Sequence, residues 1–119
     1  METQSLKLIP AIEQWRSVLT QILQEYAKLI QLGAGVRVYV LVSQDQSHFM
    51  LMHEGWQGDQ RLYGAIVHAE IRDDKIWIHF DGTEEGITEE LVAAGVPKED
   101  IVLAFHPPHL RQHTGYAVA

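Results

Sequence analysis

Cysteine is absent from the 119 residues of this sequence. Its absence excludes a disulfide framework, a metal site built on thiolates and a cysteine nucleophile. Long apolar stretches are missing too, because no run approaches the ~20 residues that a membrane helix needs. Residues 1–10 show no basic stretch followed by an apolar one, so no signal peptide is visible. These absences favour a cytoplasmic protein that does not enter a membrane.

Basic side chains are scarce as well. The chain has 9 lysines and arginines against 16 aspartates and glutamates, which gives a formal net charge of −7. Proteins bind nucleic acid largely by neutralising phosphates with such cations, and here the cations are scattered along the chain. Direct nucleic-acid binding is therefore disfavoured. The hydrophobic fraction of 46% is ordinary for a globular protein, and the length predicts a single domain over residues 1–119.

The first structural pattern is an amphipathic segment near the N-terminus. Pro10 suits the start of a helix and Gly33 suits its end, so the pattern predicts a helix over residues 11–32. Packing of this helix on the protein's own sheet is the favoured interpretation, and a coiled-coil partner is the alternative. The apolar side chains recur at alternating steps of four and three residues: Leu8, Ile12, Trp15, Leu19, Ile22, Tyr26 and Leu29.

Strand patterns follow the helix. Residues 36–42 alternate and are rich in valine, residues 49–52 are apolar, and the polar stretch between them predicts a turn. Residues 55–59 contain two glycines and predict a loop. Residues 101–105 form a short, continuously apolar run, which is typical of a strand buried on both faces.

A second hairpin is predicted from residues 61–72 and 75–80, with its turn at Asp73 and Asp74. A two-residue turn fixes a register that separates apolar from polar side chains, whereas a slip by one residue would mix the two faces. The apolar face pairs Ile71 with Ile76, Ala69 with Ile78 and Val67 with Phe80, and the polar face pairs Glu70 with Trp77 and His68 with His79.

The acidic segment 81–85 leads into a second, shorter predicted helix. Asp81 or Thr83 is expected to cap this helix, and Glu84 and Glu85 suit the positive end of its dipole. An acid–base or magnesium site is the alternative use of these carboxylates. Together the elements predict an α+β fold, a mostly antiparallel sheet of about five strands with a long N-terminal helix and a second shorter one. The expected buried stripe of the second helix is Ile87, Leu91 and Val92.

Several segments resemble the XisI family, which is named for the fdxN element excision controlling factor. Their order and spacing match the family from the N-terminal helix to the last residue, which is more specific than any single motif. The segments are Gly55–Arg61 (GWQGDQR), Lys75–Ile78 (KIWI), Asp81–Ile87 (DGTEEGI), Ala94–Leu103 (AGVPKEDIVL), Phe105-His106 and Ala117–Ala119 (AVA).

The resemblance implies a small cytoplasmic α+β protein of a family found mostly in filamentous cyanobacteria. It implies an accessory role, since the founding member acts with a companion protein called XisH when a recombinase excises a DNA element. No cofactor is implied and no enzymatic activity is expected. An acidic factor of this kind is better suited to binding a XisH-like protein than to binding DNA, and a homo-oligomer remains open.

The 7 histidines of the chain suggest a competing hypothesis. His68 and His79 are expected side by side, with Glu70 and Asp81 diagonal to them, and imidazole with carboxylate can bind zinc. A small metal-dependent hydrolase using His68, His79 and Asp81 is therefore the alternative function. An ordinary polar sheet face is the simpler interpretation. A second candidate set, His106, His109 and His113, is interrupted by two prolines that oppose a common helical face.

Two tryptophans are the most useful signals for a partner-binding surface. Trp77 is either covered by a helix or exposed as an aromatic anchor, and interfaces favour tryptophan and arginine. Trp56 with Arg61 is the second candidate anchor, and the alternative is that Trp56 plugs the end of the sheet while Arg61 pairs with Asp59 or Glu54. The predicted contact surface, from positions that resemble the family and from expected exposure, is Trp56, Arg61, Trp77, Asp81, Glu84 and His106.

Overall fold

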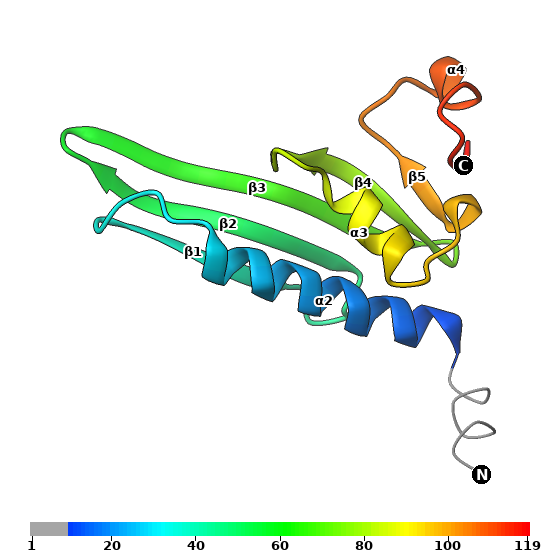
Figure 1. Cartoon of the computed structure of the whole chain (residues 1–119), viewed down its shortest axis with the longest axis horizontal. Coiled ribbons are helices and arrows are strands. Elements are labelled where there is room, and N and C mark those ends of the chain that lie inside the picture. Colours follow the sequence, from blue (N-terminus) through cyan, green and yellow to red (C-terminus); the bar gives the residue numbers. More distant parts are fainter. Residues whose placement is uncertain (1–9) are drawn as a thin grey trace, which may run out of the picture.

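A computed structural model describes residues 10–119 of the chain. It has a five-stranded sheet, with the helices α2 and α3 on one side of it (Figure 1). This arrangement confirms the predicted α+β fold with a long N-terminal helix. The elements are α2 (Ala11–Leu29), β1 (Val36–Val42), β2 (His48–Gln57), β3 (Gln60–Arg72), β4 (Lys75–Asp81), α3 (Ile87–Ala93), η1 (Lys98–Asp100), β5 (Ile101–Leu103) and α4 (Pro108–Arg111).

The strands lie in the order β1-β2-β3-β4-β5. The first four form antiparallel pairs through short turns, whereas β5 pairs parallel to β4 because α3 provides the crossover between them. The predicted strand over residues 101–105 ends at Leu103. The β2–β3 hairpin is the longest part of the sheet and extends beyond the other strands (Figure 1).

Residues 55–59 do not form the predicted loop, because β2 continues to Gln57 and the turn is at Gly58 and Asp59. Gly55 is needed because two segments of the chain approach each other closely there, not because it forms a turn. A Cβ atom at position 55 would lie 2.0 Å from the carbonyl oxygen of Gly35. In the sequence this glycine indicated a loop. In the structure its missing side chain allows β2 to lie close to the segment that precedes β1.

Helix α2 packs on the sheet through its central turns. Leu19 and Leu23 are completely buried, and each contributes about 1.5–3 kcal/mol relative to an exposed leucine. This confirms packing on the protein's own sheet, although Leu29 of the predicted seam is exposed and Leu8 is outside the described residues. The helix ends at Leu29 rather than at residue 32, because Ile30 already has an extended backbone and packs against the core.

Of the two predicted caps for α3, Asp81 supplies the acceptor for the helix start, although the N-cap position itself is occupied by Gly86. One oxygen of its carboxylate accepts a hydrogen bond from the Ile87 backbone N–H at 2.8 Å. The other accepts from the backbone N–H and the hydroxyl of Thr83, at 3.0 and 2.5 Å. The Thr83 hydroxyl oxygen in turn accepts from the Gly86 N–H at 3.0 Å. Both oxygens of Asp81 are thus used to hold the start of α3.

The β3–β4 hairpin has the predicted register near its turn, where Glu70 opposes Trp77. Asp73 and Asp74 both have positive φ angles, of 53° and 62°, as a type I′ turn requires. Farther along, a bulge changes the pairing, so His68 opposes Phe80 rather than His79. Val67 consequently opposes Asp81 rather than Phe80, which corrects the predicted register.

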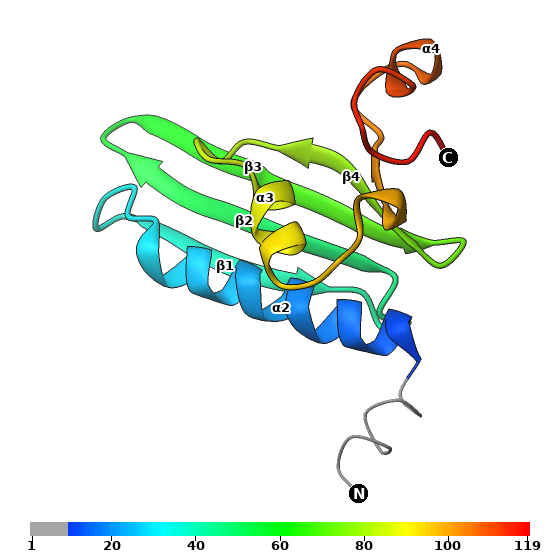
Figure 2. The same cartoon turned by 45° about the vertical axis from the view of Figure 1, so that its right-hand side comes forward.

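The C-terminal segment lies beyond the β5 edge of the sheet (Figure 2). Ala117 forms an isolated parallel bridge with Val102, and its N–H donates to the carbonyl of Ile101 at 2.8 Å. The helix α4 begins at Pro108, directly after Pro107. The guanidinium of Arg111 ties the segment together by donating to the carbonyl of His106 at 3.0 Å.

Candidate partner-binding face of the sheet

The candidate site is the face of the sheet that points away from α2 and α3, here called the open face. Both helices lie on the opposite side of the strands (Figures 1 and 2). Side chains alternate between faces along a strand, so Phe49 and Leu51 enter the core while Met50 and Met52 point to the open face. The observed pairing, together with the contact of His79 with Glu70, places on the open face Arg37, Tyr39, Leu41, His48, Met50, Met52, Glu54, Trp56, Arg61, Tyr63, His68, Glu70, Arg72, Lys75, Trp77 and His79, among others.

An arginine–aromatic cluster occupies the end of the open face near the β2–β3 turn. The Arg61 guanidinium lies 5.4 Å from the ring centre of Trp56 and 5.7 Å from that of Tyr63. Trp56 is 53% exposed and Tyr63 is 67% exposed. Large aromatic side chains that are exposed beside arginine have the composition of a protein-binding surface.

Glu54 organises this cluster. Its two carboxylate oxygens bind Arg37 at 2.8 Å and Arg61 at 2.7 Å. Hydrogen bonds from Arg37 and Arg61 hold the pKa of Glu54 below its usual range. The guanidinium of Arg37 also lies 4.6 Å from the Tyr39 ring centre. The ion pairs therefore hold both arginines next to the aromatic rings in the free chain, and a surface organised in this way loses less entropy when a ligand binds.

The structure decides between the two predictions for Trp56 and Arg61. Arg61 pairs with Glu54, as one alternative expected. Trp56 does not plug the sheet, because more than half of its surface is exposed. Between this cluster and the other end of the face, Met50 and the exposed Leu41 provide an apolar surface that can adapt to a partner.

A histidine cluster occupies the other end of the open face. His48 Nδ1 lies 3.0 Å from His68 Nε2, and His79 Nε2 lies 2.8 Å from a carboxylate oxygen of Glu70. The His68 and His79 ring centres are 4.9 Å apart. Burial lowers the pKa of His68, and positive charge on His79 and His48 lowers it further. His68 therefore stays neutral to a lower pH than a free histidine does.

The predicted metal set is not assembled. His68 and His79 are neighbours, but the bulge in β4 turns Asp81 toward α3, where its two oxygens hold the helix start. In the part of the chain that the structure describes, no group of three or more histidine, aspartate or glutamate side chains is arranged to bind a metal ion. This also covers the tail histidines at positions 106, 109 and 113.

Trp77 is not the exposed anchor of the sequence prediction. Its side chain is 8% exposed, and its indole N–H donates to the carbonyl of Arg72 at 3.0 Å. The guanidinium of Arg72 lies 3.7 Å from the ring centre, and that of Arg111 in α4 lies at 5.6 Å. Two arginines cover this tryptophan, so its role is in packing.

Three other predicted contact residues lie away from the open face. Asp81 holds α3, and Glu84 is exposed in the loop before α3 on the helix side. His106 is exposed after β5, with its ring 4.6 Å from that of Phe105. The structure thus brings together Trp56 and Arg61 alone of the predicted set. The alternation of residues 36–42 and 60–72 was the signal that could have added Arg37, Tyr39 and Tyr63.

Among the described residues, no helix is both long and apolar enough to cross a membrane. The family model for XisI protein matches residues 9–118. No curated protein matches the chain.

Solved structures share this fold, among them two from one cyanobacterial strain. A crystal structure of a XisI-like protein from Anabaena variabilis ATCC 29413 has 36% sequence identity and a TM-score of 0.85, over 91% of this chain and 99% of that one. The fdxN element excision controlling factor XisI from the same strain has 30% identity and a TM-score of 0.79, over 92% of this chain and 100% of that one. Because the family model spans almost the whole chain and both structures agree with it, the chain belongs to the XisI family.

Proposed function

We propose that this protein is a non-enzymatic accessory factor that controls site-specific DNA excision by binding a XisH-like protein through its open face. The excision role is supported by the similarity to the fdxN element excision controlling factor XisI. The single observation that carries the binding role is the exposed Trp56 beside the ion-paired Arg61. Tryptophan and arginine are among the residues most enriched at the hot spots of protein interfaces.

The distribution of charge supports a protein partner rather than DNA. Glu54 pairs with both Arg37 and Arg61, so two positive charges and one negative charge leave this trio with a net charge of only +1 for binding phosphates. The open face therefore offers aromatic and apolar surface framed by satisfied ion pairs. Such a surface fits another protein better than a polyanion.

The first experiment is co-purification of the protein with a XisH-like protein, followed by native mass spectrometry of the eluted species. A stoichiometric, metal-free complex supports the proposal. A chain that does not bind the XisH-like protein and carries a metal ion contradicts it and favours the hydrolase hypothesis. A chain found only as a homo-oligomer, with the XisH-like protein unbound, assigns the open face to self-association and also contradicts the proposal.

A further inference from the structure

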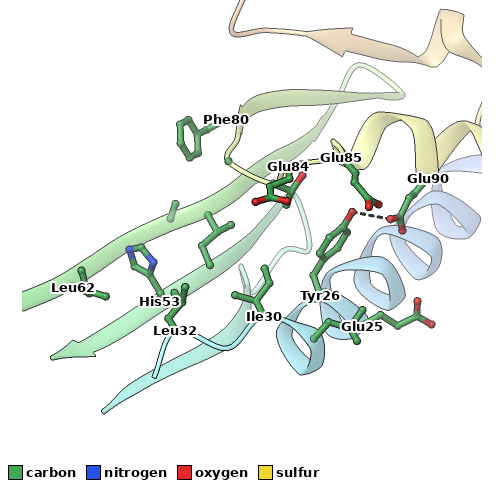
Figure 3. A pocket seen from close by; sticks show the side chains of 15 residues that line it. Glu25, Tyr26, Ile30, Leu32, His53, Leu62, Phe80, Glu84, Glu85 and Glu90 are labelled. Carbon is green, nitrogen blue, oxygen red and sulfur yellow. Dashed lines mark hydrogen bonds between the residues drawn. The ribbon is translucent and has the colours of Figure 1, made fainter. Parts of the chain in front are cut away.

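A groove with a volume of about 730 Å³ lies on the helix side of the sheet, opposite to the open face. Three parts of the chain form it: the C-terminal part of α2, the β2–β3 hairpin, and the segment from the end of β4 into α3 (Figure 3). None of its lining residues takes part in the proposed binding of a XisH-like protein.

The walls and floor of this groove are apolar. Leu29, at the end of α2, is 77% exposed, and Phe80, at the end of β4, is 50% exposed. Ile30, Leu62 and Ile66 also line the groove. Covering such surface is favourable by about 25 cal/mol for each Å² removed from water. Two large apolar side chains on different walls thus offer binding energy that the isolated chain leaves unused.

The rim of the groove is negatively charged. Glu25 comes from α2, Glu84 and Glu85 from the loop, and Glu90 from α3 (Figure 3). No lysine or arginine of residues 10–119 is among the lining residues. These four carboxylates come from three parts of the chain, and a cationic side chain from outside would be attracted to all of them.

Tyr26 also lines the groove, and its pKa is raised in part by the same glutamates. Its hydroxyl donates to a carboxylate oxygen of Glu90 at 2.7 Å. Burial, this hydrogen bond and the charges of Glu90, Glu85 and Asp81 raise the pKa of Tyr26 to about 12. Capping of α3 does not account for the whole cluster, because Asp81 already holds the helix start and Glu25 belongs to α2.

We infer that this groove binds a cationic amphipathic segment of a partner protein. The segment places apolar side chains between Leu29 and Phe80 and directs lysine or arginine side chains to the rim glutamates. Nucleic acid is disfavoured as an occupant because the carboxylates repel phosphates. An acidic or neutral peptide is disfavoured because it brings no positive charge to the rim glutamates.

The test uses two labelled peptides and the full chain. In the first peptide, leucines recur at helical spacing and lysines flank them; in the second, glutamate replaces every lysine. Fluorescence anisotropy measures the affinity, and amide chemical shifts in NMR spectra locate the site. We expect the lysine peptide to bind at least ~100-fold more tightly than the glutamate peptide. The largest shifts should fall on Leu29, Phe80 and their neighbours.

Variants separate the groove from general charge attraction. Glu84→Gln with Glu85→Gln should weaken binding of the lysine peptide by ~10-fold, and Leu29→Asp by at least as much. The control, Asp59→Asn with Glu99→Gln, removes two exposed acidic charges that do not line the groove and should change affinity less than about twofold. Equal losses in both double variants, or shifts on the open face, would overturn the inference. Full displacement of the peptide by n-butylamine would overturn it too, in favour of a small-amine site.

Discussion

The guanidinium of Arg61 lies 5.4 Å from the ring centre of Trp56, and the two residues oppose each other on β3 and β2. Arg61 is also held by Glu54, so its position beside the ring does not depend on a partner. Trp56 remains more than half exposed in this arrangement. An aromatic anchor that is already oriented loses little freedom when it becomes buried in a complex.

Truncating this anchor should weaken the complex with the XisH-like protein without harming the fold. We expect Trp56→Ala to reduce affinity by ~30-fold, equivalent to about 2 kcal/mol, as measured by isothermal titration calorimetry. Leu29→Ala is the matched control, because Leu29 is also a large, exposed apolar residue but lies on the helix side. Unchanged affinity in Trp56→Ala, with a normal circular dichroism spectrum, would remove the open face from the proposed function.

Trp77 should behave in the opposite way. Because its ring is buried beneath Arg72 and near Arg111, Trp77→Ala leaves a cavity and should lower the free energy of unfolding by about 3–5 kcal/mol. Urea denaturation measures this loss, and Trp56→Ala is the control, with an expected change below about 1 kcal/mol. If Trp77→Ala lowers the free energy of unfolding by as little as Trp56→Ala is expected to, the burial of Trp77 contributes little to stability.

The different fates of the two tryptophans show what sequence can and cannot predict here. The register near the Asp73-Asp74 turn was predictable, because a one-residue slip would have mixed apolar and polar side chains. The cover over Trp77 was not, because Arg111 is distant in sequence and an arginine lying on an aromatic ring has no periodic signature.

The bulge in β4 could not be predicted from the sequence either. His79, Phe80 and Asp81 alternate as polar, apolar and polar, which is the pattern of an unbroken strand. The capping bonds of Asp81 require its side chain on the helix side, and the bulge supplies the change of face. Capping chemistry was therefore predicted correctly from local sequence, while its effect on the hairpin depended on where α3 packs.

Asp81 provides a direct test of that cap. Asp81→Ala removes the acceptor of the Ile87 and Thr83 N–H groups and should cost about 1–2 kcal/mol of stability. Glu84→Gln is the control: Glu84 is an exposed acidic residue of the same loop, and its loss should change stability by less than about 0.5 kcal/mol. Thermal or urea unfolding gives both values. A cost no larger than that of the control would contradict the capping role.

Gly55 tests the close contact at the long hairpin. A Cβ atom there would lie 2.0 Å from the Gly35 carbonyl oxygen, so Gly55→Ala should force the two segments apart and destabilise the fold by about 2 kcal/mol or more. Gly58 is the control, because nothing lies within 4 Å of a Cβ atom at that position and its φ of +59° suits asparagine. Gly58→Asn should cost less than about 1 kcal/mol. If both variants unfold at the same urea concentration, the contact at Gly55 is not needed.

The histidine cluster predicts how stability depends on pH. Burial and the charges of His79 and His48 lower the pKa of His68 from 6.5. The unfolded chain then binds a proton at His68 at a higher pH than the folded protein does. Protonation in this window favours unfolding, so the stability is fully present above about pH 6.5 and is lost as the pH falls through the folded-state pKa.

Urea unfolding at about pH 7.5 and about pH 5.5 measures this effect, and the midpoint should be lower at the acidic pH. His68→Gln should reduce the difference, whereas His109→Gln, in the exposed tail, should leave it unchanged. Glu70 does not contribute in this range: burial acts to raise its pKa, but the His79 hydrogen bond and nearby positive charges lower it overall. The Glu70 carboxylate therefore stays ionised at both pH values. If the difference between the two pH values is undiminished in His68→Gln, another titrating group causes it and the prediction is wrong.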